Sequence, residues 1–163
     1  MATSSLETAA AQRRLGLKAV ELARQSLGVR EDLGPNWGRW VQVYLKAAGL
    51  LFPAPWCAAF VSFKIHQAAE RLGMSARWPR RAPAAVSSSF LFRWARREGL
   101  LIREPEAGCA FLIDGGPTGH RHTGFVASVD RAARTIRTIE GNIGDRVCSR
   151  ELPWEGLTFL RVA

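Results

Sequence analysis

The chain has 163 residues, 47% of them hydrophobic, and carries 23 Lys or Arg against 14 Asp or Glu, a formal net charge of +9. This length and composition fit one folded domain and exclude a disordered chain. No apolar run approaches the ~20 residues that span a bilayer. The three cysteines, at positions 57, 109 and 148, form no paired metal-ligand motif. We therefore expect no disulfide framework, no metal site and no cofactor.

The N-terminal residues 1–14 contain no basic segment followed by an apolar stretch, which is the pattern of a secretory signal. We expect synthesis in the cytoplasm, with residues 1–14 as a candidate flexible segment. The positive charge favours anionic partners, for which nucleic acid, an anionic membrane face and a cell-wall polymer are the candidates. Twenty of the basic residues are arginine, a bias that genomic base composition also produces.

Hydrophobic periodicity and stop signals predict four helices in the first hundred residues. A proline is tolerated in the first turn of a helix but not later, so the third helix should begin beside Pro55 and hold Cys57 in its first turn. The predicted helices are 8–27, 37–48 after an Asn36 N-cap, a third from Pro55 to the stop at Gly73, and 90–99 after capping serines.

After Gly99 the apolar runs become short and turn residues separate them, which predicts strands. Five such runs follow one another, so we expect an antiparallel β-meander of about five strands. Helices first and strands second indicate the α+β class, with the N-terminal helices packed on the C-terminal sheet.

A cysteine nucleophile needs a base to take its proton and a third group that orients the base. Three histidines are available for Cys57. His66 follows it by about 2.5 turns of the same predicted helix and so points to the opposite side. His120 and His122 precede an apolar strand, and either could serve as the base.

Strand register favours His122. If residues 122–129 and 135–142 form a hairpin that turns around 130–132, paired residue numbers sum to about 262, and His122 faces Glu140. Asn142, two residues further on the same face, could add a hydrogen bond to the imidazole or polarise the substrate. His120 falls in the Gly-rich turn "GGPTGHR", where its direction cannot be predicted, so it stays open as a competitor.

The position of Cys57 suits thiolate chemistry, because the first turn of a helix has unpaired N–H groups and partial positive charge. A neighbouring histidinium lowers a cysteine pKa further, and the same amides could hold the oxyanion of a tetrahedral intermediate. The alternative is a buried, inert thiol, which is how most free cysteines behave.

Three stretches in order, "PWCAAFV", "HTGFVASVD" and "TIEGN", resemble the CHAP group (cysteine, histidine-dependent amidohydrolases and peptidases) of the NlpC-like, papain-like superfamily. The resemblance covers about residues 16–147 and implies a papain-like fold and a single catalytic domain over 1–163. It implies Cys57 as nucleophile, His122 as base, Glu140 as third catalytic residue and Asn142 as an auxiliary polar group. Related chains carry an acidic residue where Cys109 stands here.

That resemblance implies cleavage of an amide bond in peptidoglycan without a metal, by an amidase or endopeptidase that reaches the wall after phage lysis or specialised delivery. Two alternatives stay open. One keeps the fold and acts on a small non-wall amide, as an amidase or an acyl transferase. The other is a basic module without catalysis that binds nucleic acid through "RWPRRAP" and "RWARRE". We expect a monomer with peptidoglycan as partner and no role for nucleic acid.

Overall fold

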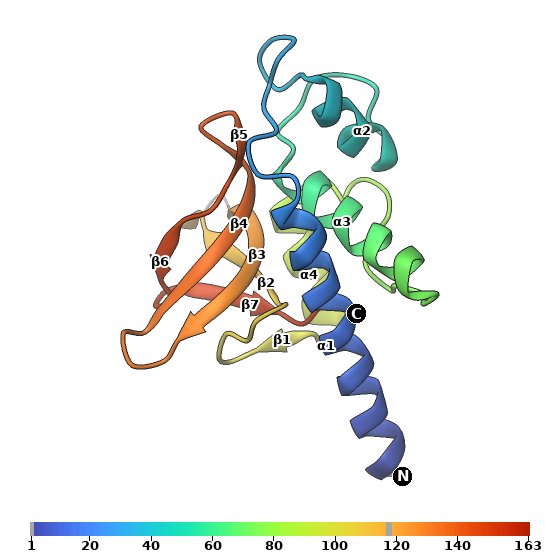
Figure 1. Cartoon of the computed structure of the whole chain (residues 1–163), viewed down its shortest axis with the longest axis vertical. Helices are drawn as coiled ribbons and strands as arrows, with labels where there is room; N and C mark the ends of the chain where they lie inside the picture. The colour runs from blue at the N-terminus through green and yellow to red at the C-terminus, as the bar shows by residue number, and fades with distance from the viewer. Residues whose placement is uncertain (1, 117–118) are drawn as a thin grey trace.

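The computed structural model describes residues 2–116 and 119–163, without the side chains of residues 2–5 and His120. In this part of the chain four helices precede an antiparallel sheet, which confirms the α+β prediction (Figure 1). The helices are α1 (Ala2–Arg24), α2 (Arg39–Ala47), α3 (Cys57–Leu72) and α4 (Ser88–Arg97). The strands are β1 (Leu101–Ile102), β2 (Ala110–Asp114), β3 (His120–Asp130), β4 (Thr135–Ile143), β5 (Arg146–Cys148), β6 (Glu151–Pro153) and β7 (Leu157–Leu160).

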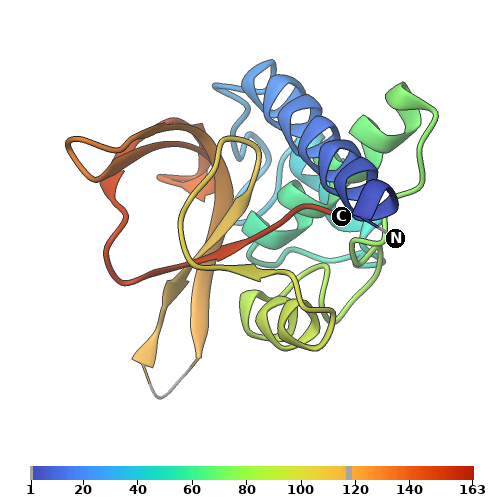
Figure 2. The ribbon, with the colours of Figure 1, turned by 90° about the horizontal axis from the view of Figure 1, so that it is seen from below.

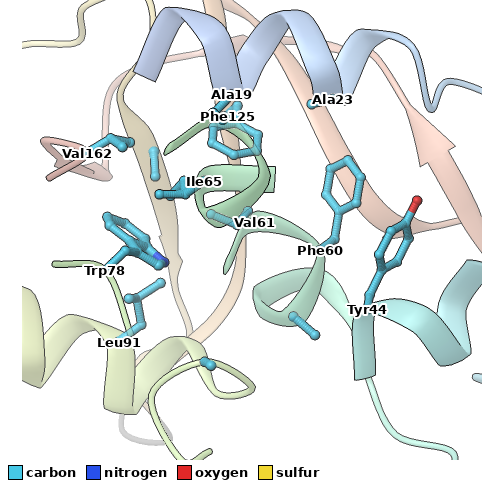
Figure 3. Packing of buried hydrophobic residues seen from close by; sticks show 14 of the residues in the cluster. Ala19, Ala23, Tyr44, Phe60, Val61, Ile65, Trp78, Leu91, Phe125 and Val162 are labelled. Carbon is cyan, nitrogen blue, oxygen red and sulfur yellow. The ribbon is translucent and has the colours of Figure 1, made fainter. Parts of the chain in front are cut away.

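Helix α3 is the centre of the helical layer, since it contacts α1, α2 and strands β3 and β4. It ends at Gly73, which takes the left-handed conformation at φ 63° as its predicted stop role requires. Figure 3 shows how buried side chains from α1, α2, α3, α4 and β3 meet around it. This packing fixes the axis of α3, and with it the direction in which its first turn points.

Two helix starts differ from their predictions. Helix α1 begins at Ala2 rather than near residue 8, and its first turns project away from the rest of the molecule (Figure 1). Asn36 is not the N-cap of α2, because Gly38 takes that position and has no side chain to offer. The preceding loop supplies the cap instead: the Arg39 N–H donates to Asp32 Oδ1 at 2.8 Å. None of the helices in the described ranges is long and apolar enough to cross a membrane.

The sheet runs in the order β1-β7-β2-β3-β4-β5, with β6 also paired to β4. Only β2 to β5 follow chain order as a meander. Strand β7, the last of the described strands along the chain, lies between β1 and β2 and pairs with both. The last residue is also anchored, since its carbonyl oxygen accepts a hydrogen bond from the Trp78 N–H at 3.0 Å. The sheet curls on the side away from the helices (Figure 2).

Each face of the sheet covers its own apolar cluster. The larger cluster fills the space between sheet and helices and includes Phe125 of β3. The smaller cluster lies on the other face and is formed by Cys109, Phe111, Val126, Ile136 and Phe159. Strand β3 therefore contributes to both clusters, which holds it firmly between them.

Candidate active site

Cys57 is the first residue of α3, as predicted from the prolines before it. Trp56, the N-cap residue, is completely buried, and its ring stacks on Tyr44 with centroids 5.9 Å apart. The indole Nε1–H of Trp56 donates to Glu31 Oε1 at 2.9 Å. These contacts hold the start of the helix in one place and leave Cys57 only 7% exposed.

His122 of β3 and Glu140 of β4 form a hydrogen bond of 2.8 Å between His122 Nε2 and Glu140 Oε2. Nε2 is thus engaged by the carboxylate, and the imidazole is also hydrogen-bonded to the Cys57 side chain. The side chain of Glu140 is completely buried and that of His122 is 12% exposed. The structure therefore brings Cys57, His122 and Glu140 together as one hydrogen-bonded chain.

The register of the hairpin differs from the predicted one. Phe125 pairs with Ile139 and Val126 with Thr138, so paired numbers near the site sum to 264 and not to about 262. The cause is a longer connection, since the ladder closes at Asp130 and Thr135 and a bulge lies between Val126 and Ser128. An even shift keeps the same faces of the two strands together.

This register puts Gly124, not His122, across from Glu140. The imidazole and the carboxylate therefore meet along the diagonal of the ladder, which long side chains can span. Gly124 makes the diagonal possible, because a Cβ at this position would lie 2.7 Å from Glu140 Cγ and 2.9 Å from Phe111 Cε1. The glycine of the "HTG" stretch thus leaves the space that the Glu140 side chain occupies.

The electrostatics of the chain favour a charged pair at neutral pH. Burial alone would raise the pKa of Cys57, but the hydrogen bond and charge of His122, with the backbone N–H groups of Thr123 and Ala58, lower it below its ordinary value. Burial would likewise lower the pKa of His122, yet the hydrogen bonds and charges of Cys57 and Glu140 raise it to about 9. Both shifts favour the thiolate–imidazolium form of the pair over the neutral form.

Glu140 has further partners that the sequence did not predict. Burial would raise its pKa, but His122, Arg150 and Thr138 hold it at about 2. Arg150 donates from Nε to Oε1 at 2.9 Å and from Nη2 to Oε2 at 2.7 Å, and the hydroxyl of Thr138 donates to Oε1. The sequence feature that bears on the position of Arg150 is the hairpin between β4 and β5.

That hairpin turns at Gly144 and Asp145, which both have positive φ (58° and 61°). Such a pair forms a two-residue turn between antiparallel strands. Ile143 then pairs with Arg146, Glu140 lies across from Cys148, and the Thr138 N–H donates to the carbonyl of Arg150, two residues after β5. Placing Arg150 next to the carboxylate would have required both this turn and the register shift between Glu140 and Ile143.

The side chain of Asn142 lies near Trp56, the N-cap residue of α3. Its amide Nδ2 is 3.4 Å from Asn36 Oδ1, and turning the amide over would instead join it to Glu31 Oε1 and to the Trp56 N–H, both at 3.3 Å. In either orientation the amide contacts the segment before α3 rather than the imidazole. The side chain of His120, the competing base, lies outside the described part of the structure.

The remaining predicted groups lie elsewhere. Cys109 is 2% exposed in the smaller cluster, where burial raises its pKa to about 12. His66 lines a cavity of about 170 Å³ on the outer side of α3 with Arg80, which is 3.4 Å from its Nδ1. In residues 2–116 and 119–163 no group of three His, Cys, Asp or Glu side chains could hold a metal ion.

The two basic runs contain tryptophans that are not free to stack on bases. Trp78 is 2% exposed and packs edge-on against Trp94, with ring centroids 5.3 Å apart. Both rings belong to the larger apolar cluster. The arginines around them are exposed. The tryptophan rings pack within the protein, so they do not support the base stacking that the nucleic-acid hypothesis requires.

The model of the CHAP domain family matches residues 51–142, a span that begins before α3 and ends in β4. It includes Cys57, His122, Glu140 and Asn142. None of the curated proteins matches the chain.

Proposed function

Since the chain belongs to the CHAP domain family of amidase- and peptidase-type hydrolases, we propose that it is a cysteine hydrolase that cleaves an amide bond of peptidoglycan. The observation that carries this proposal is the hydrogen-bonded chain from Cys57 through His122 to Glu140. The pKa shifts of the three groups are in the directions that favour nucleophilic catalysis by a thiolate.

The reaction begins with attack of the Cys57 thiolate on the amide carbonyl carbon, which forms a C–S bond and places negative charge on the carbonyl oxygen. Backbone N–H groups at the start of α3 are suited to stabilise this oxyanion, because the first turn of a helix has unpaired donors. The imidazolium of His122 then gives its proton to the amine nitrogen as the C–N bond breaks. The amine leaves, and the acyl group remains on Cys57 as a thioester.

Hydrolysis of the thioester uses the same groups in the opposite sense. His122, now neutral, takes a proton from water, whose oxygen attacks the thioester carbonyl. The C–S bond breaks, the carboxylic acid leaves, and the thiolate–imidazolium pair is restored. Glu140 stays ionised throughout, because its role is to orient the imidazole and to stabilise its charged form.

The net charge supports a wall substrate. A formal charge of +9 attracts an anionic polymer and raises the rate of encounter with it. We place the action of the protein at the cell wall, which it reaches after phage lysis or by specialised delivery, as a monomer.

The test is digestion of purified sacculi. The protein should release new amino groups and soluble fragments, and mass analysis of these fragments identifies the bond that is cut. Cys57→Ala should lower the rate by more than about 10³-fold, whereas Cys109→Ala should stay within about twofold of the unchanged protein because that thiol lies in the smaller cluster.

Retained activity in Cys57→Ala would refute the thioester mechanism. Hydrolysis of small amides without any release from sacculi would keep the mechanism and move the substrate to the non-wall class. A protein that does neither, and whose nucleic-acid affinity falls steeply with salt, would support the binding-module alternative.

A further inference from the structure

Arg150 contacts the site directly, although the mechanism gives it no role. It follows β5 and donates two parallel hydrogen bonds to Glu140, from Nε at 2.9 Å and from Nη2 at 2.7 Å. One of the two acceptors, Oε2, is the same oxygen that receives His122 Nε2–H at 2.8 Å. A guanidinium fork bound in this way sets the plane of the carboxylate as well as its charge.

The fork is itself held by the sheet. The Thr138 N–H donates to the Arg150 carbonyl at 2.8 Å, and the Arg150 N–H lies 3.3 Å from Thr138 Oγ1. Thr138 is completely buried, and its hydroxyl also donates to Glu140 Oε1. Backbone and side chain thus close one network around the carboxylate, which ties Arg150, in the connection between β5 and β6, to β4.

The burial of Glu140 makes this network necessary. A fully buried carboxylate is strongly unfavourable unless charges and hydrogen bonds compensate for the lost water. The groups that face it are His122 from β3, with Cys57 behind, Cys148 from β5, and Arg150 with Thr138. In this set Arg150 is the cation whose charge does not change during the reaction.

We propose that Arg150 is a positioning residue of the site, which clamps the Glu140 carboxylate in the orientation that His122 requires. This inference rests on the proposed roles of Cys57, His122 and Glu140. Arg150 acts through the carboxylate and not on the substrate. Its loss should therefore alter the Cys57–His122 pair even when no substrate is present.

A matched arginine provides the control. Arg137, on β4, forms a single ion pair with Glu151 at 3.2 Å, and both side chains are more than half exposed. Exposed pairs of this kind contribute little. Arg137→Met therefore removes the same side chain from the same sheet without touching the site.

The experiment measures the rate of Cys57 alkylation by iodoacetamide against pH in the unchanged protein, Arg150→Met, Arg150→Lys and Arg137→Met, with peptide mapping to separate the three cysteines. In Arg150→Met, Glu140 gains a proton more readily, His122 loses its ionic partner, and Cys57 loses the imidazolium. The acid limb of the pH profile for Cys57 alkylation should move to higher pH by about one unit or more, so that alkylation at pH 6 slows about tenfold. Release of amino groups from sacculi should fall by about 10- to 100-fold in kcat/KM.

Arg150→Lys keeps the charge but loses the fork, so its acid limb should lie between those of the unchanged protein and Arg150→Met. If Arg150→Met does not fold, as judged by its thermal transition, the lysine variant decides the question. Arg137→Met should give the profile of the unchanged protein.

Superimposable alkylation profiles for the unchanged protein and the folded Arg150 variants would overturn the proposal. A loss of wall activity with an unchanged alkylation profile would also overturn it, because it would assign Arg150 to substrate binding. Alkylation needs no wall substrate, so this result is independent of whether peptidoglycan is the substrate.

Discussion

The start of α3 and the start of β2 each bury a thiol, and the two thiols differ in their chemistry. Cys57 is 7% exposed and Cys109 is 2% exposed, so burial penalises the thiolate at both positions. Cys57 lies beside the imidazole of His122, whose hydrogen bond and charge lower the pKa of the thiol. Cys109 lies in an apolar cluster, and its pKa rises to about 12. Reactivity in this protein therefore depends on the partner that faces the sulfur and not on its exposure.

The largest expected effect is selective alkylation. Because iodoacetamide reacts with the thiolate, Cys57 in the folded protein at pH 7 should react at least about 10³-fold faster than Cys109. His122→Ala should reduce this difference by tenfold or more, since the cation that lowers the Cys57 pKa is gone. Mass mapping of the alkylated cysteines gives both rates. Equal rates for the two thiols in the folded protein would remove the contrast.

Next in size is the effect of Glu140→Gln on catalysis. The amide can still accept a hydrogen bond but cannot stabilise an imidazolium, so kcat/KM for sacculus digestion should fall by about 10²- to 10⁴-fold. The measurement is the rate of amino-group release at saturating and limiting substrate. A glutamine variant with unchanged kinetics would mean that Cys57 does not need an ionised third residue.

Acid should destabilise the protein through the same carboxylate. The pKa of Glu140 is about 2 in the folded protein against an ordinary value near 4.5, so the unfolded chain binds more protons between these values. The stabilisation is present above pH 4.5 and is lost as the pH falls toward 2, with an expected size of roughly 3 kcal/mol. Denaturant unfolding at several pH values measures this slope, which should become shallower in Glu140→Gln. A parallel slope in that variant would assign acid sensitivity to other groups.

The smallest expected effect on activity belongs to Gly124→Ala. A methyl group there would press on Glu140 and Phe111 and displace the carboxylate from His122, which should lower kcat/KM about tenfold and destabilise the fold by about 1–3 kcal/mol. Gly16→Ala is the control, because its methyl would meet the backbone of Gly108 away from the site. That variant should lose stability but keep the alkylation rate of Cys57. If Gly124→Ala and Gly16→Ala slow the alkylation of Cys57 equally, Gly124 has no specific role beside Glu140.

The features that could be predicted from the sequence are those that depend on a few neighbouring residues, such as helix ends and the faces of strands. Prolines before Cys57 and a glycine after Leu72 mark the ends of α3 because each restricts or frees the backbone at one position. The alternation of side chains was sufficient to put His122 and Glu140 on one face. The separation of the chain into helices and sheet follows from the same kinds of pattern.

Features that depend on pairing between distant segments were not predictable in this way. The four residues between Asp130 and Thr135 and the bulge after Val126 moved the register by two, and nothing in the composition of the strands specifies that number. Arg150 reaches Glu140 only through a second hairpin. The insertion of β7 between β1 and β2 joins segments some fifty residues apart, a distance over which hydrophobic pattern carries no information about partners.

The position of β7 also governs the order in which the molecule can be built. A ribosome that has translated the nucleophile, the base and the carboxylate has still not delivered residues 157–160, which pair with both β1 and β2. Until they emerge, the sheet stays open along that edge and the smaller cluster lacks Phe159. A nascent chain can therefore hold every reacting group in its sequence while its sheet still lacks the strand that joins β1 to β2.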